Sequence, residues 1–156
     1  MSAVDTDVPT ILRLIGALAE YEKLAHEVVA TAASLREALF GAYPAAECLI
    51  AREGERPVGF ALFFHNFSTF RGQRGIYLED LFVEPDCRSK GYGRALLQRL
   101  AQLAVERNCA RLEWSVLDWN APAIGFYRSL GAQLMEEWRI FRLTDQALQA
   151  FAASPR

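Results

Sequence analysis

Residues 76–94 read IYLEDLFVEPDCRSKGYGR and combine a strand pattern, a tight turn and the start of a helix. The strand pattern covers residues 76–83 and ends before Pro85. Gly91 and Gly93 mark the turn, where backbone N–H groups can approach a ligand closely and the next helix presents its positive end. Three basic side chains add positive charge at the same place: Arg88, Lys90 and Arg94. The stretch therefore predicts a strand–turn–helix site suited to a pyrophosphate.

Taken alone, these residues could equally form an ordinary surface turn before a helix, with no bound ligand. It is not the dinucleotide-binding fingerprint, because Leu96 stands where the third small residue is required. It is not a phosphate-binding loop of the Walker type either, since the sequence Gly-Lys-Ser/Thr is missing.

The patterns on either side predict one continuous domain, residues 1–156, with the order α-α-β-β-β-α-β-α-β-α. We expect helices over residues 7–22, 31–41, 94–106, 121–130 and after Thr144, and strands over residues 48–51, 58–64, 76–83, 112–116 and 137–143. Residues 65–74 are expected to form a loop. The first three strands indicate an antiparallel meander, and the later strand–helix–strand steps indicate parallel crossovers. The predicted fold is a mixed α/β (α+β) sheet with helices on both faces.

Composition narrows the class of protein. The chain has 156 residues, 52% hydrophobic and 23% charged, which excludes a disordered or fibrous protein. Seventeen Lys and Arg against nineteen Asp and Glu give a net charge of −2, which argues against nucleic acid or a membrane surface as a partner. Three cysteines without a C-x-x-C pair, and two separated histidines, favour reduced thiols and no metal. With no membrane-length apolar run and no signal-like start, we expect a cytoplasmic protein.

Two segments resemble the motifs of one family. Residues 77–93 resemble the acetyl-CoA motif of the GNAT N-acetyltransferases, with its Q/R-x-x-G-x-G/A turn. Residues 116–132, VLDWNAPAIGFYRSLGA, resemble the family's later asparagine and tyrosine segment. Residues 18–22 and 137–139 are similar to the diamine branch, which contains the spermidine/spermine and thialysine acetyltransferases. The strand that precedes the first helix in such relatives is not evident in this chain.

The resemblance implies a GNAT acyltransferase fold, acetyl-CoA as co-substrate, and a homodimer with the amine site near the subunit interface. Backbone groups of the strand would bind the pantetheine, the turn would bind the pyrophosphate, and Tyr127 would protonate the leaving thiolate as general acid. The expected acetyl-CoA contacts are Leu81, Phe82, Val83, Arg88, Ser89, Lys90, Gly91, Tyr92, Gly93, Arg94, Asn120, Ala123 and Tyr127. The expected contacts to the amine are Tyr21, Glu22, Glu79, Asp80, Glu136 and Trp138.

The residues themselves favour Glu79 as the catalytic base. Strict alternation would place Tyr77, Glu79, Leu81 and Val83 on one face and Leu78, Asp80 and Phe82 on the other. A carboxylate among apolar neighbours would have a raised pKa, which suits removal of a proton from an alkylammonium. The alternative is a structural carboxylate at a bulge. Asp80 fits a structural pairing as well as a substrate contact.

Other candidate residues keep two interpretations as well. Tyr127 could be a packing residue of the helix core. Glu22 and Glu113 could be ordinary surface charges, and Trp119 and Trp138 could either face an ammonium or pack in the core.

The sequence thus predicts an N-acetyltransferase that transfers acetyl from acetyl-CoA directly to a primary amine of a small cationic substrate. The alternatives are a protein or peptide lysine acetyltransferase and a non-catalytic acyl-CoA-binding module. The presence of both Glu79 and Tyr127 argues against the latter, because a binding module needs neither an acid nor a base.

Overall fold

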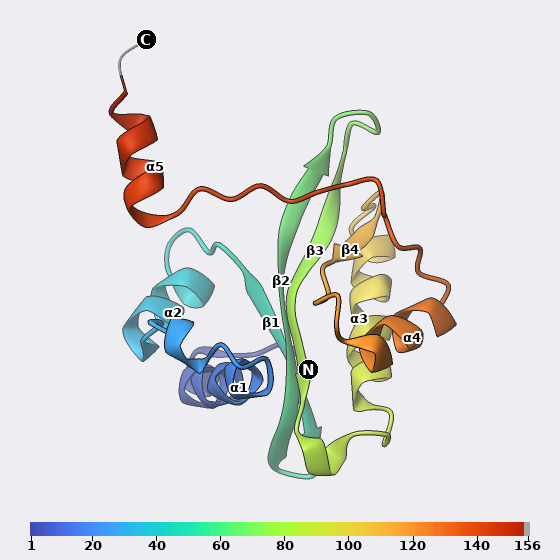
Figure 1. Cartoon of the computed structure of the whole chain (residues 1–156). Helices are drawn as coiled ribbons and strands as arrows, with labels where there is room; N and C mark the ends of the chain where they lie inside the picture. Colours follow the sequence, from blue (N-terminus) through green and yellow to red (C-terminus); the bar gives the residue numbers. More distant parts are fainter. Residues whose placement is uncertain (155–156) are drawn as a thin grey trace. The chain divides into compact units, whose positions relative to one another are not determined.

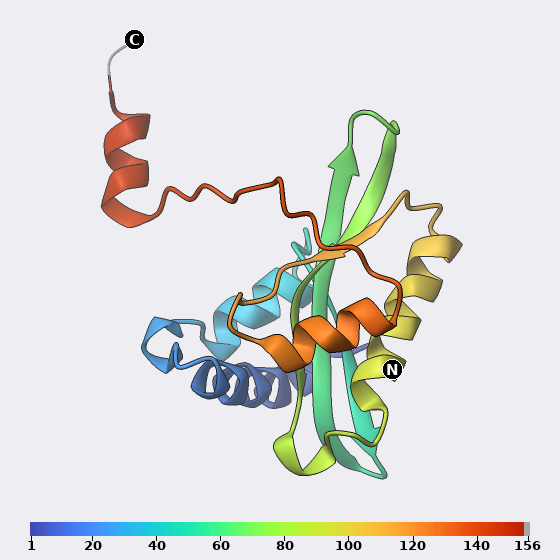
Figure 2. The same ribbon diagram turned by 45° about the vertical axis from the view of Figure 1, so that its right-hand side comes forward.

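The computed structural model describes residues 1–154, which divide into two units. The first unit, Met1–Ser115, holds a four-stranded sheet with helices on both faces (Figure 1, Figure 2). The second unit begins at Val116 and contains two helices in its described part. The predicted fold class, a mixed sheet with helices on both faces, is confirmed.

The helices and strands follow the predicted order except for the strand expected at residues 137–143. The first unit contains the helices α1 (Val8–Tyr21), α2 (Ala32–Phe40) and α3 (Tyr92–Glu106), and short 3-10 turns at Asp5–Asp7, Ala25–Glu27 and Pro85–Cys87. Its strands are β1 (Glu47–Glu53), β2 (Arg56–Ser68), β3 (Gln73–Val83) and β4 (Leu112–Trp114). The second unit contains α4 (Ala121–Ser129) and α5 (Asp145–Ala152).

The sheet has the strand order β1-β2-β3-β4. The first three strands are antiparallel neighbours, as the predicted meander requires. β4 pairs with β3 in parallel after the crossover through α3. In both ribbon views α1 and α2 lie on one face of this sheet and α3 on the other (Figure 1, Figure 2).

Each face of the sheet is covered by an apolar helix surface. On the side of α1 and α2, the buried cluster consists of Ile11, Leu14, Leu18, Leu39, Cys48, Ile50, Phe60 and Phe82. On the other side, α3 buries Leu96, Leu97, Leu100, Leu103 and Ala104. Full burial of one such aliphatic side chain contributes about 1.5–3 kcal/mol, so both faces stabilise the sheet.

The predicted loop at residues 65–74 is wrong. β2 continues to Ser68 and β3 begins at Gln73, with cross-strand pairs such as Phe67 opposite Arg74. A turn that includes Gly72, whose φ is +62°, joins them. The polar side chains here conceal a strand because half of a hairpin's positions face water.

The predicted strand at residues 137–143 is also wrong. These residues have no regular secondary structure, and Trp138 is 74% and Phe141 96% exposed. A strand needs a hydrogen-bonded neighbour, and the described part of the second unit contains none. The alternation of apolar residues alone is therefore not enough to predict a strand.

The N-terminal residues partly supply the strand that precedes the first helix in relatives and that is not evident in the sequence. Ser2 forms an isolated antiparallel bridge with Leu49 of β1. The N–H of Ala3 donates to the carbonyl oxygen of Cys48 at 2.9 Å. Asp7 stands at the N-cap of α1, where its carboxylate pairs with Arg52 at 2.6 Å instead of capping the helix.

Gly59 offers a test of how tightly β2 and β3 approach. A Cβ added at Gly59 would lie 2.6 Å from the carbonyl oxygen of Phe82 and 3.3 Å from Cα of Val83. Because these are backbone atoms of a paired strand, Gly59→Ala should lower the free energy of unfolding by about 1–3 kcal/mol. Gly16→Ala, where nothing lies within 4 Å of the added Cβ, should raise it by about 0.5–1 kcal/mol. Urea denaturation measures both variants, and equal stabilities would contradict the clash.

Candidate active site

One extra residue interrupts the pairing of β2 with β3. Leu62 lies opposite Asp80 and Phe63 lies opposite Leu78, so Glu79 is the additional residue of a β-bulge. Directly opposed residues point to the same face of a sheet, while Leu62 and Phe63 point to opposite faces. Asp80 and Leu78 therefore lie on opposite faces, and the prediction that they share one is wrong.

The bulge places Asp80 on the face covered by α1 and α2. Its partner Leu62 packs against the buried cluster of that face. Cys48 of β1 lies opposite Leu62, so the three side chains form one row across the sheet. Asp80 is half-buried in this row, whereas Glu79 is exposed. The burial that the sequence predicts for Glu79 is thus found at Asp80.

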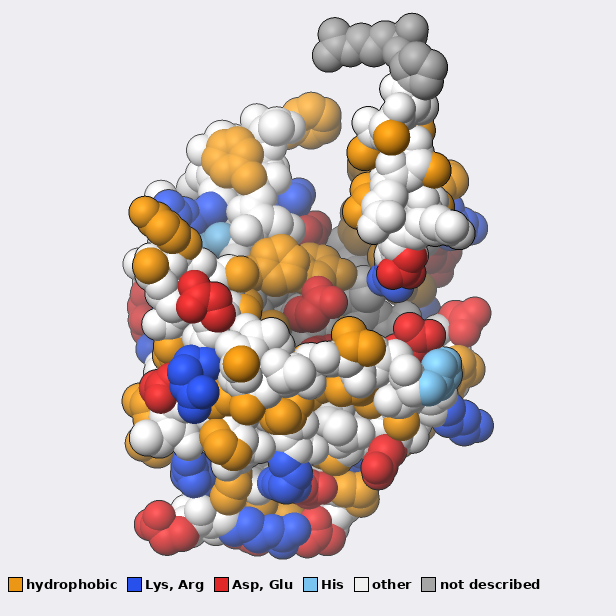
Figure 3. Space-filling model, turned by 90° about the vertical axis from the view of Figure 1, so that its left-hand side faces the viewer, with side chains coloured by type: hydrophobic (Ala, Val, Ile, Leu, Met, Phe, Trp, Pro, Cys, Tyr) orange, Lys and Arg blue, Asp and Glu red, His pale blue; other side chains and the backbone are white. Residues whose placement is uncertain are grey.

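Three carboxylates share this region: Glu22, Glu79 and Asp80, which we call the carboxylate cluster. The pKa of Asp80 is raised to about 6, mainly because burial disfavours the charged form, and also because of the negative charges of Glu79 and Glu22. Burial also raises the pKa of Glu22, at the C-terminal end of α1. Figure 3, which views this face, shows acidic side chains lying among hydrophobic ones. Such surroundings favour a cationic ligand.

Glu113 does not belong to this cluster. Its carboxylate pairs with Arg111 at 3.1 Å and accepts a hydrogen bond from Asn66 Nδ2 at 3.0 Å. The interpretation of Glu113 as an ordinary charged residue is therefore favoured.

Beyond Leu78, the edge of β3 that faces β4 is open. β4 pairs with β3 only at residues 76–78, and the described strands include no other on that side. The N–H of Glu84 donates to the carbonyl oxygen of Val58 at 2.8 Å. Because hydrogen-bonded and non-hydrogen-bonded pairs alternate along an antiparallel ladder, Leu81 and Val83 turn their backbone groups to the open edge. An extended ligand with amide groups can add to β3 here as a further strand.

The turn between β3 and α3 has the backbone conformation that an anion site requires. Ser89 has a φ of +62° and Gly91 a φ of +88°. Gly91 is the N-cap of α3, and no side chain caps this fifteen-residue helix. The first backbone N–H groups of the helix thus lack a side-chain acceptor and suit an anionic ligand. A Cβ at Gly93 would lie 3.8 Å from the Val83 side chain, which places the turn beside the open edge of β3.

Arg88 connects this turn to the end of α1. Its Nε donates to the carbonyl oxygen of Val83 at 3.1 Å, so one backbone group of Val83 already has a partner. Its guanidinium carbon lies 4.4 Å from the ring centre of Tyr21 and 5.7 Å from that of Phe82. Cation–π contacts of this kind hold the side chain against the face of the carboxylate cluster.

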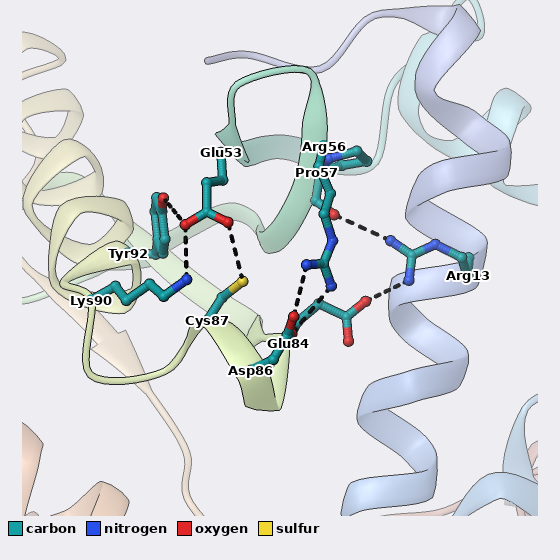
Figure 4. Close-up of polar contacts among 9 residues, drawn as sticks. All are labelled: Arg13, Glu53, Arg56, Pro57, Glu84, Asp86, Cys87, Lys90 and Tyr92. Carbon is teal, nitrogen blue, oxygen red and sulfur yellow. Dashed lines mark hydrogen bonds and ion pairs between the residues drawn. The ribbon is translucent and has the colours of Figure 1, made fainter.

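Glu53, at the end of β1, is a residue that sequence reasoning missed. Figure 4 shows its carboxylate between Lys90 and Tyr92: Oε1 lies 2.9 Å from Lys90 Nζ and accepts a hydrogen bond from the Tyr92 hydroxyl at 3.2 Å. Lys90 in turn lowers the pKa of Glu53. Arg94, the third predicted basic residue of the turn, is exposed. No sequence motif links a hairpin carboxylate to a turn 37 residues away.

The remaining predicted site residues belong to the second unit and are described within it. Asn120 is the N-cap of α4, and its Oδ1 accepts a hydrogen bond from the N–H of Ala123 at 3.3 Å. The ring of Tyr127 is half-buried and lies 5.5 Å, centre to centre, from that of Phe126. Glu136 and Trp138 are exposed.

Metal-binding groups are not found in the described part of the chain. Among residues 1–154, no three His, Cys, Asp or Glu side chains lie close enough to hold a metal ion. His65 lies between the carbonyl oxygen of Gly75 and Arg107, with both distances 3.1 Å.

None of the helices in residues 1–154 is long and apolar enough to span a membrane.

Comparison with known proteins gives consistent matches over most of the chain. The model of the acetyltransferase (GNAT) family matches residues 15–132. The thialysine N-epsilon-acetyltransferase of Bos taurus is 38% identical over 96% of this chain and 94% of the relative. The L-ornithine N5-acetyltransferase of Arabidopsis thaliana is 34% identical over 95% of this chain and 85% of the relative. A solved integron cassette protein from the mobile metagenome of V. cholerae has a TM-score of 0.83 and 27% identity, covering 99% of this chain and 96% of that chain.

The raised pKa of Asp80 predicts a pH-dependent gain in stability for Asp80→Asn. Folding raises this pKa from 3.8 to about 6, so the folded state favours the protonated carboxyl. The stabilisation present below pH 4 is lost as the pH rises through 6. The amide carries no charge at any pH. The free energy of unfolding of Asp80→Asn should therefore equal that of the wild type near pH 4 and exceed it by about 1–2 kcal/mol at pH 8. This difference is smaller than the full pKa shift implies, because Asp80 is partly exposed to solvent.

Denaturant titrations at the two pH values measure this difference. Glu55→Gln, an exposed carboxylate in the turn between β1 and β2, serves as the matched control and should show no such change with pH. A stability gain for Asp80→Asn that is the same at pH 4 and pH 8 would contradict the burial of a charged carboxylate.

Proposed function

The chain belongs to the acetyltransferase (GNAT) family, and we propose that it transfers acetyl from acetyl-CoA to the terminal primary amine of a small cationic substrate. The observation that carries this proposal is the carboxylate cluster at the bulge, one residue away from the open edge of β3. A cation site and an extended-ligand site thus meet at neighbouring residues of one strand.

The open edge and the turn support acetyl-CoA as the donor. Leu81 and Val83 would bind the amide groups of the pantetheine through their backbone, with Phe82 between them. The backbone N–H groups from Ser89 to Arg94 would bind the pyrophosphate, assisted by the positive end of α3. Lys90 and Arg94 would add formal charge there. Asn120 and Ala123 would line the thiol end of the pantetheine.

The carboxylate cluster supports a small amine as the acceptor. An ammonium group is stabilised by nearby carboxylates, and three are present: Glu22, Glu79 and Asp80. The relatives are named for thialysine and ornithine, which each end in a primary amine on a short chain. We therefore propose a diamine, a polyamine or a basic amino acid of this kind as the substrate, with Tyr21 as a further contact. Glu136 and Trp138 are contacts that the family resemblance alone implies.

The reaction would proceed by direct attack of the amine on the thioester. The amine nitrogen forms a bond to the carbonyl carbon, the C–S bond breaks, and Tyr127 protonates the departing thiolate. The N–H of Leu81 would stabilise the oxyanion, and a carboxylate of the Glu79–Asp80 pair would take the proton of the ammonium. A covalent acetyl-cysteine is disfavoured, because burial raises the pKa of Cys48 to about 12 and also raises that of Cys87.

The family resemblance and the cysteines support an assembly and a compartment. The family resemblance supports a homodimer, with the amine site near the subunit interface. The three cysteines are unpaired, which supports a reducing compartment such as the cytoplasm. Sedimentation of the purified chain measures its oligomeric state.

Release of CoA across an amine panel tests the proposed function. The panel contains putrescine, spermidine, spermine, thialysine, ornithine, lysine and a lysine-containing peptide, each with acetyl-CoA fixed. We expect one small amine to exceed the peptide in kcat/KM by at least about tenfold, because the three carboxylates can stabilise the second cationic group that such an amine carries. Preference for the peptide would indicate a protein lysine acetyltransferase. Binding of acetyl-CoA without turnover of any amine would indicate an acyl-CoA-binding module.

Tyr127→Phe tests the proposed general acid. Loss of the phenol proton should lower kcat by about 10²-fold while the Kd for acetyl-CoA stays within about twofold, because the ring is retained. Tyr43→Phe removes the hydroxyl of a tyrosine that is 94% exposed and should leave both constants unchanged. An unchanged kcat in Tyr127→Phe would favour the interpretation of Tyr127 as a packing residue.

A further inference from the structure

We propose that Glu53, at the end of β1, weakens the binding of the CoA phosphates by compensating the charge of Lys90, and that this helps the product CoA to leave. The inference rests on the proposed use of acetyl-CoA and deepens it, because it names a residue that sets the affinity for the donor. Glu53 acts through Lys90 and does not itself bind CoA, so it is a positioning residue.

The first observation is the set of contacts around the Glu53 carboxylate. Oε1 lies 2.9 Å from Lys90 Nζ and accepts a hydrogen bond from the Tyr92 hydroxyl at 3.2 Å. Oε2 lies 4.0 Å from the sulfur of Cys87, which is buried. Figure 4 shows the side chain reaching from the β1–β2 hairpin to these three residues, which follow the end of β3. The carboxylate is thus held beside the turn that the pyrophosphate would approach.

The second observation is that Lys90 differs from the other two basic residues of the turn. Arg88 donates to the carbonyl oxygen of Val83, and Arg94 is exposed. Among the described residues 1–154, Lys90 is the one of the three that pairs with a carboxylate. The charges of Arg88 and Arg94 are therefore available to a phosphate group, whereas that of Lys90 is opposed by Glu53.

The third observation is that both members of this pair carry their charge at neutral pH. The hydrogen bond from Lys90 lowers the pKa of Glu53, and the same contact raises the pKa of Lys90. A phosphate group at the turn would be attracted by the ammonium and repelled by the carboxylate beside it. The pair therefore contributes less to the affinity for CoA than an unpaired lysine would.

A moderate affinity for CoA serves the reaction. Acetyl-CoA and CoA carry the same phosphates, so a stronger phosphate site would hold the product as firmly as the donor. Release of product limits the rate of many enzymes. Compensation of Lys90 by Glu53 lowers the affinity for both molecules and shortens the time for which the product occupies the site.

Titration calorimetry of CoA with the purified, unliganded chain tests the inference. Glu53→Gln keeps the length of the side chain and an acceptor for the Tyr92 hydroxyl, and it removes only the charge. It should lower the Kd for CoA by about two- to fivefold, which corresponds to the energy of an exposed ion pair. Lys90→Gln should raise the Kd by a similar factor, because it leaves the carboxylate uncompensated.

The double variant and the salt dependence separate an effect of charge from an effect of shape. In Glu53→Gln/Lys90→Gln the two changes oppose each other, so the Kd should lie between those of the single variants. An increase in salt from about 50 mM to about 500 mM should reduce the difference between Glu53→Gln and the wild type, since exposed charges are screened. In steady-state kinetics, Glu53→Gln should lower the KM for acetyl-CoA and the inhibition constant of CoA together, without a comparable change in the KM for the amine.

Glu55→Gln is the matched control. Glu55 is an exposed carboxylate in the same hairpin turn, so its replacement changes the net charge of the chain by the same amount. It should leave the Kd for CoA unchanged at both salt concentrations. An equal effect of the two variants would mean that net charge, and not the contact with Lys90, sets the affinity, and would overturn the inference.

The remaining outcomes are distinguishable. If Glu53→Gln raises the Kd, Glu53 holds the turn in its binding conformation and the inference is overturned. An unchanged Kd, or a difference that does not vary with salt, overturns it as well, while the proposed acetyl transfer stands. If the wild type binds no CoA, the proposed donor fails and the inference falls with it. If the variants behave as expected but no amine is acetylated, the inference holds and the proposed transfer fails.

Discussion

A single extra residue in β3 is the constraint on which the site depends. Because Glu79 has no opposite residue on β2, the side-chain alternation of β3 changes between Leu78 and Asp80. Before the bulge, β3 pairs with β4, and beyond it that edge is open. The bulge therefore moves a carboxylate onto the face of α1 in the same stretch of β3 where backbone groups turn to an unpaired edge. In a regular strand, Glu79 and not Asp80 would lie opposite Leu62 on this face.

The turn after β3 and the end of α1 are joined by contacts that belong to neither motif. Arg88 stacks on Tyr21 and donates to the carbonyl oxygen of Val83, so one side chain contacts both the end of α1 and the end of β3. Glu53 holds Lys90 from the opposite side of the turn. Both contacts are exposed ion or cation–π interactions, whose contribution to stability is small. Their effect is to fix the direction of the side chains around the turn.

Much of this arrangement was predictable from local patterns, and the errors have physical causes. The strand, turn and helix of residues 76–94, and the grouping of Glu22 with Glu79 and Asp80, follow from motif and resemblance. The face of Asp80 did not, because a bulge is set by pairing with another strand and leaves no mark in the alternation of residues. The prediction of a strand at residues 137–143 was wrong for a related reason. Apolar alternation makes a segment able to pair as a strand, but it does not provide the neighbouring strand.

The cost of Asp80 is itself an argument about function. A half-buried carboxylate beside two others destabilises the folded state at neutral pH, and Asn at this position would relieve that cost without a change in shape. Packing alone would favour the amide or an apolar residue on this face. Residues that lower stability where a neutral replacement would fit are characteristic of reactive positions, because the same desolvation that disfavours the charge makes the group a stronger base.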